Sequence, residues 1–96
     1  MTVYAIVQLN VHDRPTYDRY VERFMPVFEK FNGTVLAADD RPKILQGQSD
    51  TNRAVLMSFP DKASFFAWAG SPEYQEIAKD RISASTGLIL LVEGLA

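Results

Sequence analysis

The order of strand-like and helical segments constrains the fold of this chain more than any other feature of its sequence. Two hydrophobic periods alternate along it: a two-residue period typical of strands and a three- to four-residue period typical of helices. The predicted order is strand, helix, strand, strand, helix, strand, with the second helical part split in two. The expected segments are residues 3–11, 13–33, 34–38 with a continuation at 43–47, 53–59, 61–70 followed by 71–85, and 86–94.

The first predicted helix shows the periodic signal most clearly. Asp13 is expected to cap its N-terminus, because the carboxylate can accept an amide hydrogen bond of the first turn. Pro26 predicts a kink, since proline removes one helical hydrogen bond. Asn32-Gly33 predicts an end in the left-handed conformation. The apolar stripe of this helix consists of Tyr17, Tyr20, Val21, Phe24, Phe28 and Phe31.

The segment order predicts an α+β fold of the ferredoxin-like βαββαβ kind, as a single domain over residues 1–96. This fold has a four-stranded antiparallel sheet with the helices on one face. The last strand is nevertheless apolar on both faces, with Leu88, Leu90 and Val92 on one and Ile89 and Leu91 on the other. Helices can cover only one face, and no segment remains to cover the second. We therefore expect a homodimer that is formed by the two sheets.

The composition narrows the range of partners and cofactors. The sequence has ten Lys and Arg residues and twelve Asp and Glu residues, and the Lys and Arg residues are scattered singly. The clustered positive charge that nucleic-acid binding needs is therefore absent. The sequence has no cysteine and a single histidine, so neither a disulfide nor a metal site is expected. It has no GxGxxG fingerprint for flavin or nicotinamide, and we expect no cofactor. The N-terminus does not resemble a signal peptide and residues 88–92 are too short to span a bilayer, so we expect a cytoplasmic protein without a membrane partner.

Several motifs along the chain resemble those of a known family. They are "VHDRPTYDRY", "NGTVLAADD", "LQG", "FPDKASFFAW", "SPEYQEI" and "LILLVEG". The sequence resembles a small bacterial family of unknown function, numbered thirteen-thirty among such domains, over nearly its whole length. That family is similar to the dimeric α/β-barrel superfamily, which includes antibiotic-biosynthesis monooxygenases and muconolactone isomerase-like proteins. The resemblance implies a ferredoxin-like fold and a dimer whose sheets meet face to face, and it implies no particular reaction.

The chain departs from the family pattern at two places. The first strand of the family often carries a histidine and an acid where this chain has Gln8 and Asn10. Neutral amides are weak proton-transfer groups, so the resemblance does not carry an acid–base role onto this strand. Asp39-Asp40 replaces a glycine pair that is frequent after the second strand.

Some charged residues have both a structural and a functional interpretation. His12 is expected to be an exposed loop residue, and the alternative is a ligand or a base. Asp39, Asp40 and Arg41 form either a charged turn that protects an edge strand or a site for a polar group or cation. Arg53 can hold an anion over the sheet or form an ion pair with a nearby acid, Asp50.

Tyr74 and Arg81 lie two helical turns apart and share a face of the last predicted helix. The structural interpretation is that they pack and that Arg81 forms a surface ion pair. Its candidate partners are Glu73, Glu76 and Asp80.

Two functions of different classes fit these observations. The first is a small homodimeric protein that binds a small molecule between sheet and helices, in a pocket opening near the C-terminal end of the first strand. The second, which the superfamily implies, is a cofactor-independent monooxygenase- or isomerase-like enzyme acting on a small aromatic or lactone substrate. No catalytic residue is assigned, and Trp68 can equally be a core anchor. The expected pocket residues are Tyr4, Gln8, Asn10, Tyr20 and Trp68.

Overall fold

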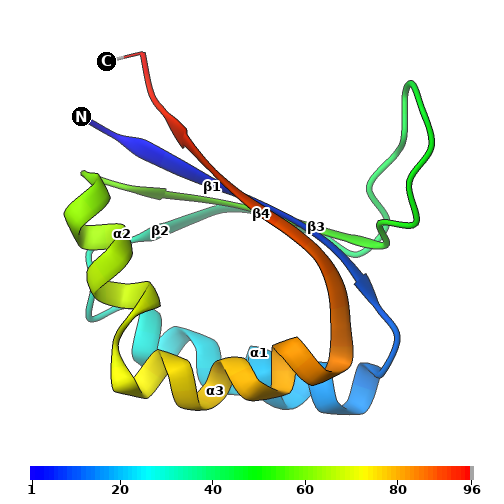
Figure 1. The fold of residues 1–96 in the computed structure, drawn as a ribbon, viewed down its shortest axis with the longest axis horizontal. Coiled ribbons are helices and arrows are strands. Elements are labelled where there is room, and N and C mark those ends of the chain that lie inside the picture. Colours follow the sequence, from blue (N-terminus) through cyan, green and yellow to red (C-terminus); the bar gives the residue numbers. More distant parts are fainter. Residues whose placement is uncertain (96) are drawn as a thin grey trace.

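The computed structural model describes residues 1–95, and in it a four-stranded antiparallel sheet carries helices on one face (Figure 1). The sheet order is β2-β3-β1-β4. The elements are β1 (Val3–Val11), α1 (Arg14–Phe28), β2 (Thr34–Asp39), β3 (Arg53–Phe59), α2 (Lys62–Ala69), α3 (Pro72–Ala84) and β4 (Ser85–Glu93). The predicted α+β, ferredoxin-like fold is confirmed.

Each helix begins at a polar residue that caps its first turn. The Asp13 carboxylate accepts from the amide of Thr16 at 3.3 Å, and Asp61 accepts from Ser64 at 2.7 Å. The hydroxyl of Ser71 accepts from the backbone amide of Tyr74 at 3.1 Å. These bonds satisfy amides that have no partner within the helix, and so they fix where α1, α2 and α3 start.

The predicted helix over residues 13–33 ends earlier than expected. Pro26 lies in the last turn of α1, which ends at Phe28. Its ring nitrogen cannot donate to the preceding turn, so the helix loses a hydrogen bond near its end. Asn32 has a φ of 62°, the expected left-handed conformation. Gly33 follows it against the rings of Phe28 and Phe59, where a Cβ atom has no room.

The predicted strand continuation at residues 43–47 is wrong. β2 ends at Asp39, and residues 40–52 form a loop that projects beyond the sheet on the side away from the helices (Figure 1). An extended segment becomes a strand only where a neighbour satisfies its backbone, and β3 pairs only with residues 34–39 on this side. We call residues 40–52 the β2–β3 loop.

The hydrophobic core lies between the helices and the sheet face that they cover, which we call the covered face. The odd-numbered residues of β1 point into it. The rings of Phe28, Phe59 and Trp68 pack together with centroids 5.4–5.5 Å apart. The buried apolar residues are Val3, Ala5, Val7, Leu9, Tyr17, Tyr20, Phe28, Met57, Phe59, Trp68, Tyr74, Ile77, Ala78 and Ala84.

The opposite side of the sheet, which we call the open face, is also apolar. Ile6 of β1 stands opposite Leu56 of β3 and Leu90 of β4. No helix or strand of residues 1–95 covers this side, and the Leu90 side chain is 48% exposed. The open face consists of Tyr4, Ile6, Leu56, Leu88, Leu90 and Val92, with Gln8 and Ala54 at one end and Ser58 at the other.

Candidate functional site

A cavity of about 370 Å³ lies between the covered face and the helices. Most of its wall is apolar, with contributions from β1, β2, β3, β4 and all three helices. This size and lining are typical of a small-molecule site. The side chains in the wall that carry polar atoms are Tyr17, Tyr20, Arg53, Trp68, Tyr74, Gln75 and Arg81.

The structure separates the five residues that the sequence assigns to one pocket. Tyr20 and Trp68 line the cavity. Tyr4, Gln8 and Asn10 alternate with the buried residues of β1 and therefore lie on the open side of the sheet. A single pocket between sheet and helices that contains all five does not form.

The two amides of β1 face the β2–β3 loop. The side-chain amide of Asn10 donates to the backbone oxygen of Asp50 at 2.6 Å. Gln8 lines a second hollow of about 250 Å³, which the loop forms with the end of the open face near Ala54. Asn10 therefore holds the loop against the sheet.

Two tyrosines form a buried polar pair in the wall of the cavity. The hydroxyl oxygens of Tyr20 and Tyr74 lie 2.8 Å apart. Burial raises the pKa of Tyr20 well above its ordinary value, so its hydroxyl is protonated at neutral pH. Two hydroxyls carry two protons, and their mutual hydrogen bond uses one of them. The pair can therefore donate one further hydrogen bond.

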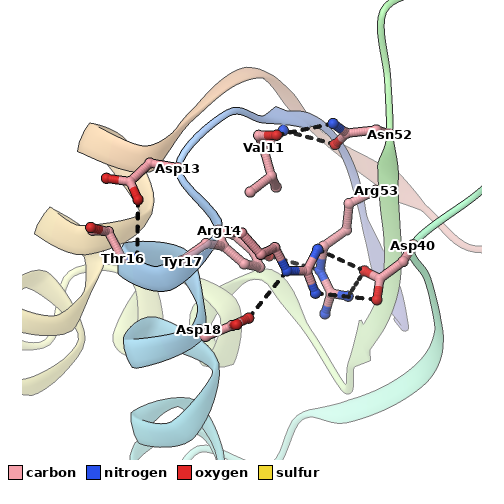
Figure 2. Close-up of polar contacts among 9 residues, drawn as sticks. All are labelled: Val11, Asp13, Arg14, Thr16, Tyr17, Asp18, Asp40, Asn52 and Arg53. Carbon is pink, nitrogen blue, oxygen red and sulfur yellow. Dashed lines mark hydrogen bonds and ion pairs between the residues drawn. The ribbon is translucent and has the colours of Figure 1, made fainter.

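A network of charges joins α1, β3 and the β2–β3 loop beside the cavity (Figure 2). Arg53 donates through Nε to the Tyr17 hydroxyl at 2.8 Å and through Nη1 to the Asp40 carboxylate at 2.6 Å. Arg14 reaches the same carboxylate at 3.2 Å and also pairs with Asp18. Hydrogen bonds from Arg53 and Arg14 lower the pKa of Asp40. The two guanidinium charges are thus matched by two carboxylates.

This network decides two of the alternatives left open by the sequence. Arg53 pairs with Asp40, and the suggested pair with Asp50 does not form. Asp40 therefore serves as a structural link between the loop and the helical layer. Asp39 accepts a hydrogen bond from the backbone amide of Arg41 at 2.8 Å, which shapes the turn after β2.

The other candidates have plainer surroundings. The His12 side chain is exposed, and its backbone amide donates to the Ala84 oxygen at 3.0 Å. Residues 1–95 contain no cluster of three or more His, Asp or Glu side chains that could hold a metal ion. None of the helices in this part of the chain has the length and hydropathy that crossing a membrane requires.

Two donors near the cavity have no hydrogen-bond partner within the described residues. They are the indole Nε1 of Trp68 and the Nε of Arg81, and both atoms are enclosed. Arg81 forms none of the ion pairs suggested by the sequence. The periodicity of α3 places it on the face of Tyr74, and spacing alone could not show that its charge would lack a partner.

The fold and the site define a class: small ferredoxin-like α+β proteins with a cavity between sheet and helices. A sequence model of the family described as "Domain of unknown function (DUF1330)" matches residues 2–95. The chain belongs to this family. No curated protein sequence matches it.

Solved structures with the same fold include proteins of unknown function. One is from Rhodopseudomonas palustris, with 20% identity, a TM-score of 0.82, and coverage of 99% of this chain and 83% of that chain. Another is a dimeric ferredoxin-like protein from a Jannaschia species, with 19% identity, a TM-score of 0.75, and coverage of 98% and 100%. At these identities, the likeness shows the fold.

A third similar structure belongs to a protein with a described activity. It is SnoaB of Streptomyces nogalater, a cofactor-independent oxygenase. The identity is 15% and the TM-score is 0.69, and the match covers 99% of this chain and 94% of that chain. Function does not follow from a shared fold, so the activity of SnoaB is a statement about SnoaB.

Proposed function

We propose that this protein binds a small, largely apolar molecule in the cavity between the covered face and the helices. The observation that carries the proposal is the cavity itself, about 370 Å³ in volume. An engineered apolar cavity of about 150 Å³ is large enough to bind benzene. The hydroxyl pair of Tyr20 and Tyr74 gives the site a hydrogen-bond donor that can orient the bound molecule. Of the residues expected from the sequence, Tyr20 and Trp68 belong to this site.

We also propose that two copies of the chain pair through their open faces. A contiguous apolar surface on a sheet is costly in water, and a twofold pairing uses the same surface twice. The β2–β3 loop supports the proposal, because Leu45 is 86% exposed on the open side of the sheet. The similar Jannaschia protein is described as dimeric. In such a dimer, Tyr4, Gln8 and Asn10 would lie at the interface.

An enzyme is the second candidate. The likeness to a cofactor-independent oxygenase favours it, together with a buried tyrosine pair that could move a proton in a water-poor cavity. The reaction would be an oxygenation or isomerisation of a small aromatic or lactone compound. The chemical test is whether a bound compound is consumed, with oxygen uptake separating oxygenation from isomerisation.

Three further properties are predicted from the sequence alone: a bacterial origin, a cytoplasmic location and the lack of a nucleic-acid partner.

A thermal-shift screen of small apolar compounds tests the binding proposal. A ligand that binds only the folded protein raises its melting temperature. Ala78 lines the cavity and is buried, so Ala78→Leu fills part of the space. Ala67 is exposed on α2 and is not part of the wall, so Ala67→Leu is the matched control. A true ligand stabilises the unmodified protein and Ala67→Leu but not Ala78→Leu. A screen without hits, or hits that stabilise all three proteins equally, would contradict the proposal.

A further inference from the structure

Arg81 carries a positive charge that nothing in the described chain neutralises. Its side chain lies in the wall of the cavity and is partly buried. Within residues 1–95 its guanidinium makes no hydrogen bond and no ion pair, although a guanidinium has five N–H donors. Its Nε is enclosed, and withdrawing this donor from water costs free energy unless a partner replaces the water.

The acids nearest to Arg81 along α3 are already engaged. Asp80 pairs with Arg19 at 3.1 Å, and Glu76 pairs with Lys79 at 2.9 Å. Glu73 pairs with Lys30, in the turn that follows α1. The C-terminal end of α3 offers Arg81 a partial negative charge, but a helix dipole supplies only about half of one elementary charge. The charge of Arg81 is therefore not balanced from within its own helix.

The polar groups of the cavity share one chemical character. Its charged wall residues are both arginines, and no Asp, Glu or Lys lines it. Arg53 is balanced by Asp40, whereas Arg81 is not. The Tyr20–Tyr74 pair has a proton left to donate. Arg81 lines the same cavity as Tyr17 and Tyr20; burial raises the pKa of both tyrosines, and the Arg81 charge acts to lower it.

We propose that the cavity takes an apolar molecule with one anionic oxygen group, such as an aromatic carboxylate or an ionised phenol or enol, and that Arg81 holds this group. This inference rests on the proposed function of the cavity. The apolar wall receives the body of the molecule, and the guanidinium forms charge-assisted hydrogen bonds to its oxygen atoms. The tyrosine pair donates an additional bond to the same anion.

Three probes with one bicyclic body test the charge preference: naphthalene carboxylate, naphthalenemethanol and naphthalenemethylammonium. Trp68 is the only tryptophan, so its fluorescence and its single indole N–H signal report on this cavity. We expect the unmodified protein to bind the carboxylate about tenfold more tightly than the alcohol, and the ammonium most weakly. Equal binding of carboxylate and alcohol would overturn this inference and leave the proposed function standing. If no probe binds, both fail.

Variants of Arg81 assign the preference to one residue. Arg81→Gln should lower carboxylate affinity to that of the alcohol while alcohol binding changes by less than about twofold. Arg81→Lys should keep part of the preference, because it keeps the charge but loses the planar fork. Arg23 is exposed on α1 outside the cavity wall, so Arg23→Gln removes the same charge elsewhere and should retain the full preference. A full preference in Arg81→Gln would refute the assignment. The three-probe comparison on the unmodified protein tests the charge preference even if Arg81→Gln does not fold.

Discussion

The two faces of this sheet come from the same four strands but depend on different partners. On the covered face, Val7 and Leu9 of β1 are almost fully buried by the chain's own helices. On the open face, Leu88 and Leu90 of β4 are about half exposed, although they are no less apolar. The alternation of a strand therefore assigns one set of residues to folding and the other to the proposed assembly.

The two faces also differ in their packing and in where their polar groups lie. On the covered face, Phe28 of α1 and Trp68 of α2 pack against Phe59 of β3, and the helices leave a cavity that Arg53 and Arg81 help to line. The open face is apolar at its centre, with Gln8 at one end and Ser58 at the other. An extended apolar surface suits another protein surface, whereas a cavity with a few donors suits a small molecule.

The largest expected effect is on the covered face. Phe28 is 1% exposed and contacts the rings of Phe24, Phe59 and Trp68. Phe28→Ala should lower the free energy of unfolding by about 3–5 kcal/mol, because it removes apolar contacts and leaves a cavity. Urea unfolding followed by circular dichroism measures it. Phe66 is 60% exposed on α2, so Phe66→Ala is the control and should cost less than about 1 kcal/mol. Equal losses would mean that the helical layer does not carry the core.

The next effect separates the open face from the covered face within one strand. Leu90 lies on the open face, and its neighbour Ile89 lines the cavity. Leu90→Asp should weaken self-association about 100-fold, or roughly 3 kcal/mol, because each copy would bury a carboxylate without a partner. Ile89→Asp should leave association intact and lower stability and ligand binding instead.

Sedimentation velocity over a range of concentrations measures this difference. Ser83 is exposed on α3, so Ser83→Asp adds the same charge outside both faces and should sediment as the unmodified protein does. A monomer of 10.8 kDa in the unmodified protein would defeat the proposed pairing, as would a dimer that survives Leu90→Asp unchanged.

The sequence predicts the fold well because the fold depends on periodicity. The burial of Val3, Ala5, Val7 and Leu9 follows from alternation alone, and strand 53–59 has the expected bounds. The continuation at 43–47 fails because extended residues need a pairing partner, which no local pattern reveals. Pro26 predicts a kink in the first helix, and in the structure it lies in the last turn of α1, so the proline marks the end of the helix.

The site is harder to predict because it depends on pairs of residues that are far apart in the sequence. The same alternation that buries Leu9 turns Gln8 and Asn10 away from the helices, so their separation from Tyr20 was implicit in the sequence. The bond between Tyr20 and Tyr74 spans 54 positions, and no spacing rule connects them. The missing partner of Arg81 depends on where Arg19 of α1 and Lys30 of the following turn lie, because they pair with Asp80 and Glu73.

Removing one hydroxyl of the Tyr20–Tyr74 pair should lower the free energy of unfolding by an intermediate amount. Tyr20→Phe leaves the Tyr74 hydroxyl buried without a partner, which should cost about 1–3 kcal/mol. Tyr74→Phe should cost a similar amount. The double variant should cost clearly less than the sum, because it leaves no orphaned group. Additive losses in denaturant unfolding would show that the two hydroxyls do not interact.

The same pair predicts a dependence on alkaline pH. Burial raises the pKa of Tyr20 in the folded protein, so the unfolded chain loses this proton first as pH rises past about 10. The neutral hydroxyl contributes its full stabilisation below that pH, and the contribution is lost as pH rises toward the folded-state pKa. Tyr20→Phe should therefore lose less stability than the unmodified protein between pH 9 and pH 11, roughly the onset of tyrosine ionisation. A parallel loss in both proteins would rule out Tyr20 as a source of this dependence.

The smallest effect concerns Asp40, which ties the loop on the open side to the helical layer through Arg14 and Arg53. These arginines lower the pKa of its carboxyl in the folded protein. The unfolded chain therefore takes up this proton first on acidification, near pH 3.9, roughly the ordinary value of aspartate. The stabilisation is present above that pH and is lost as pH falls through the lowered folded-state pKa.

Because the Asp40 side chain is half exposed, Asp40→Asn should cost less than about 1 kcal/mol at neutral pH. The difference between the two proteins in thermal unfolding should shrink toward about pH 2, and also in about 1 M salt, which screens exposed charges. A difference that grows on acidification would mean that Asp40 does not stabilise the loop as an ionised group.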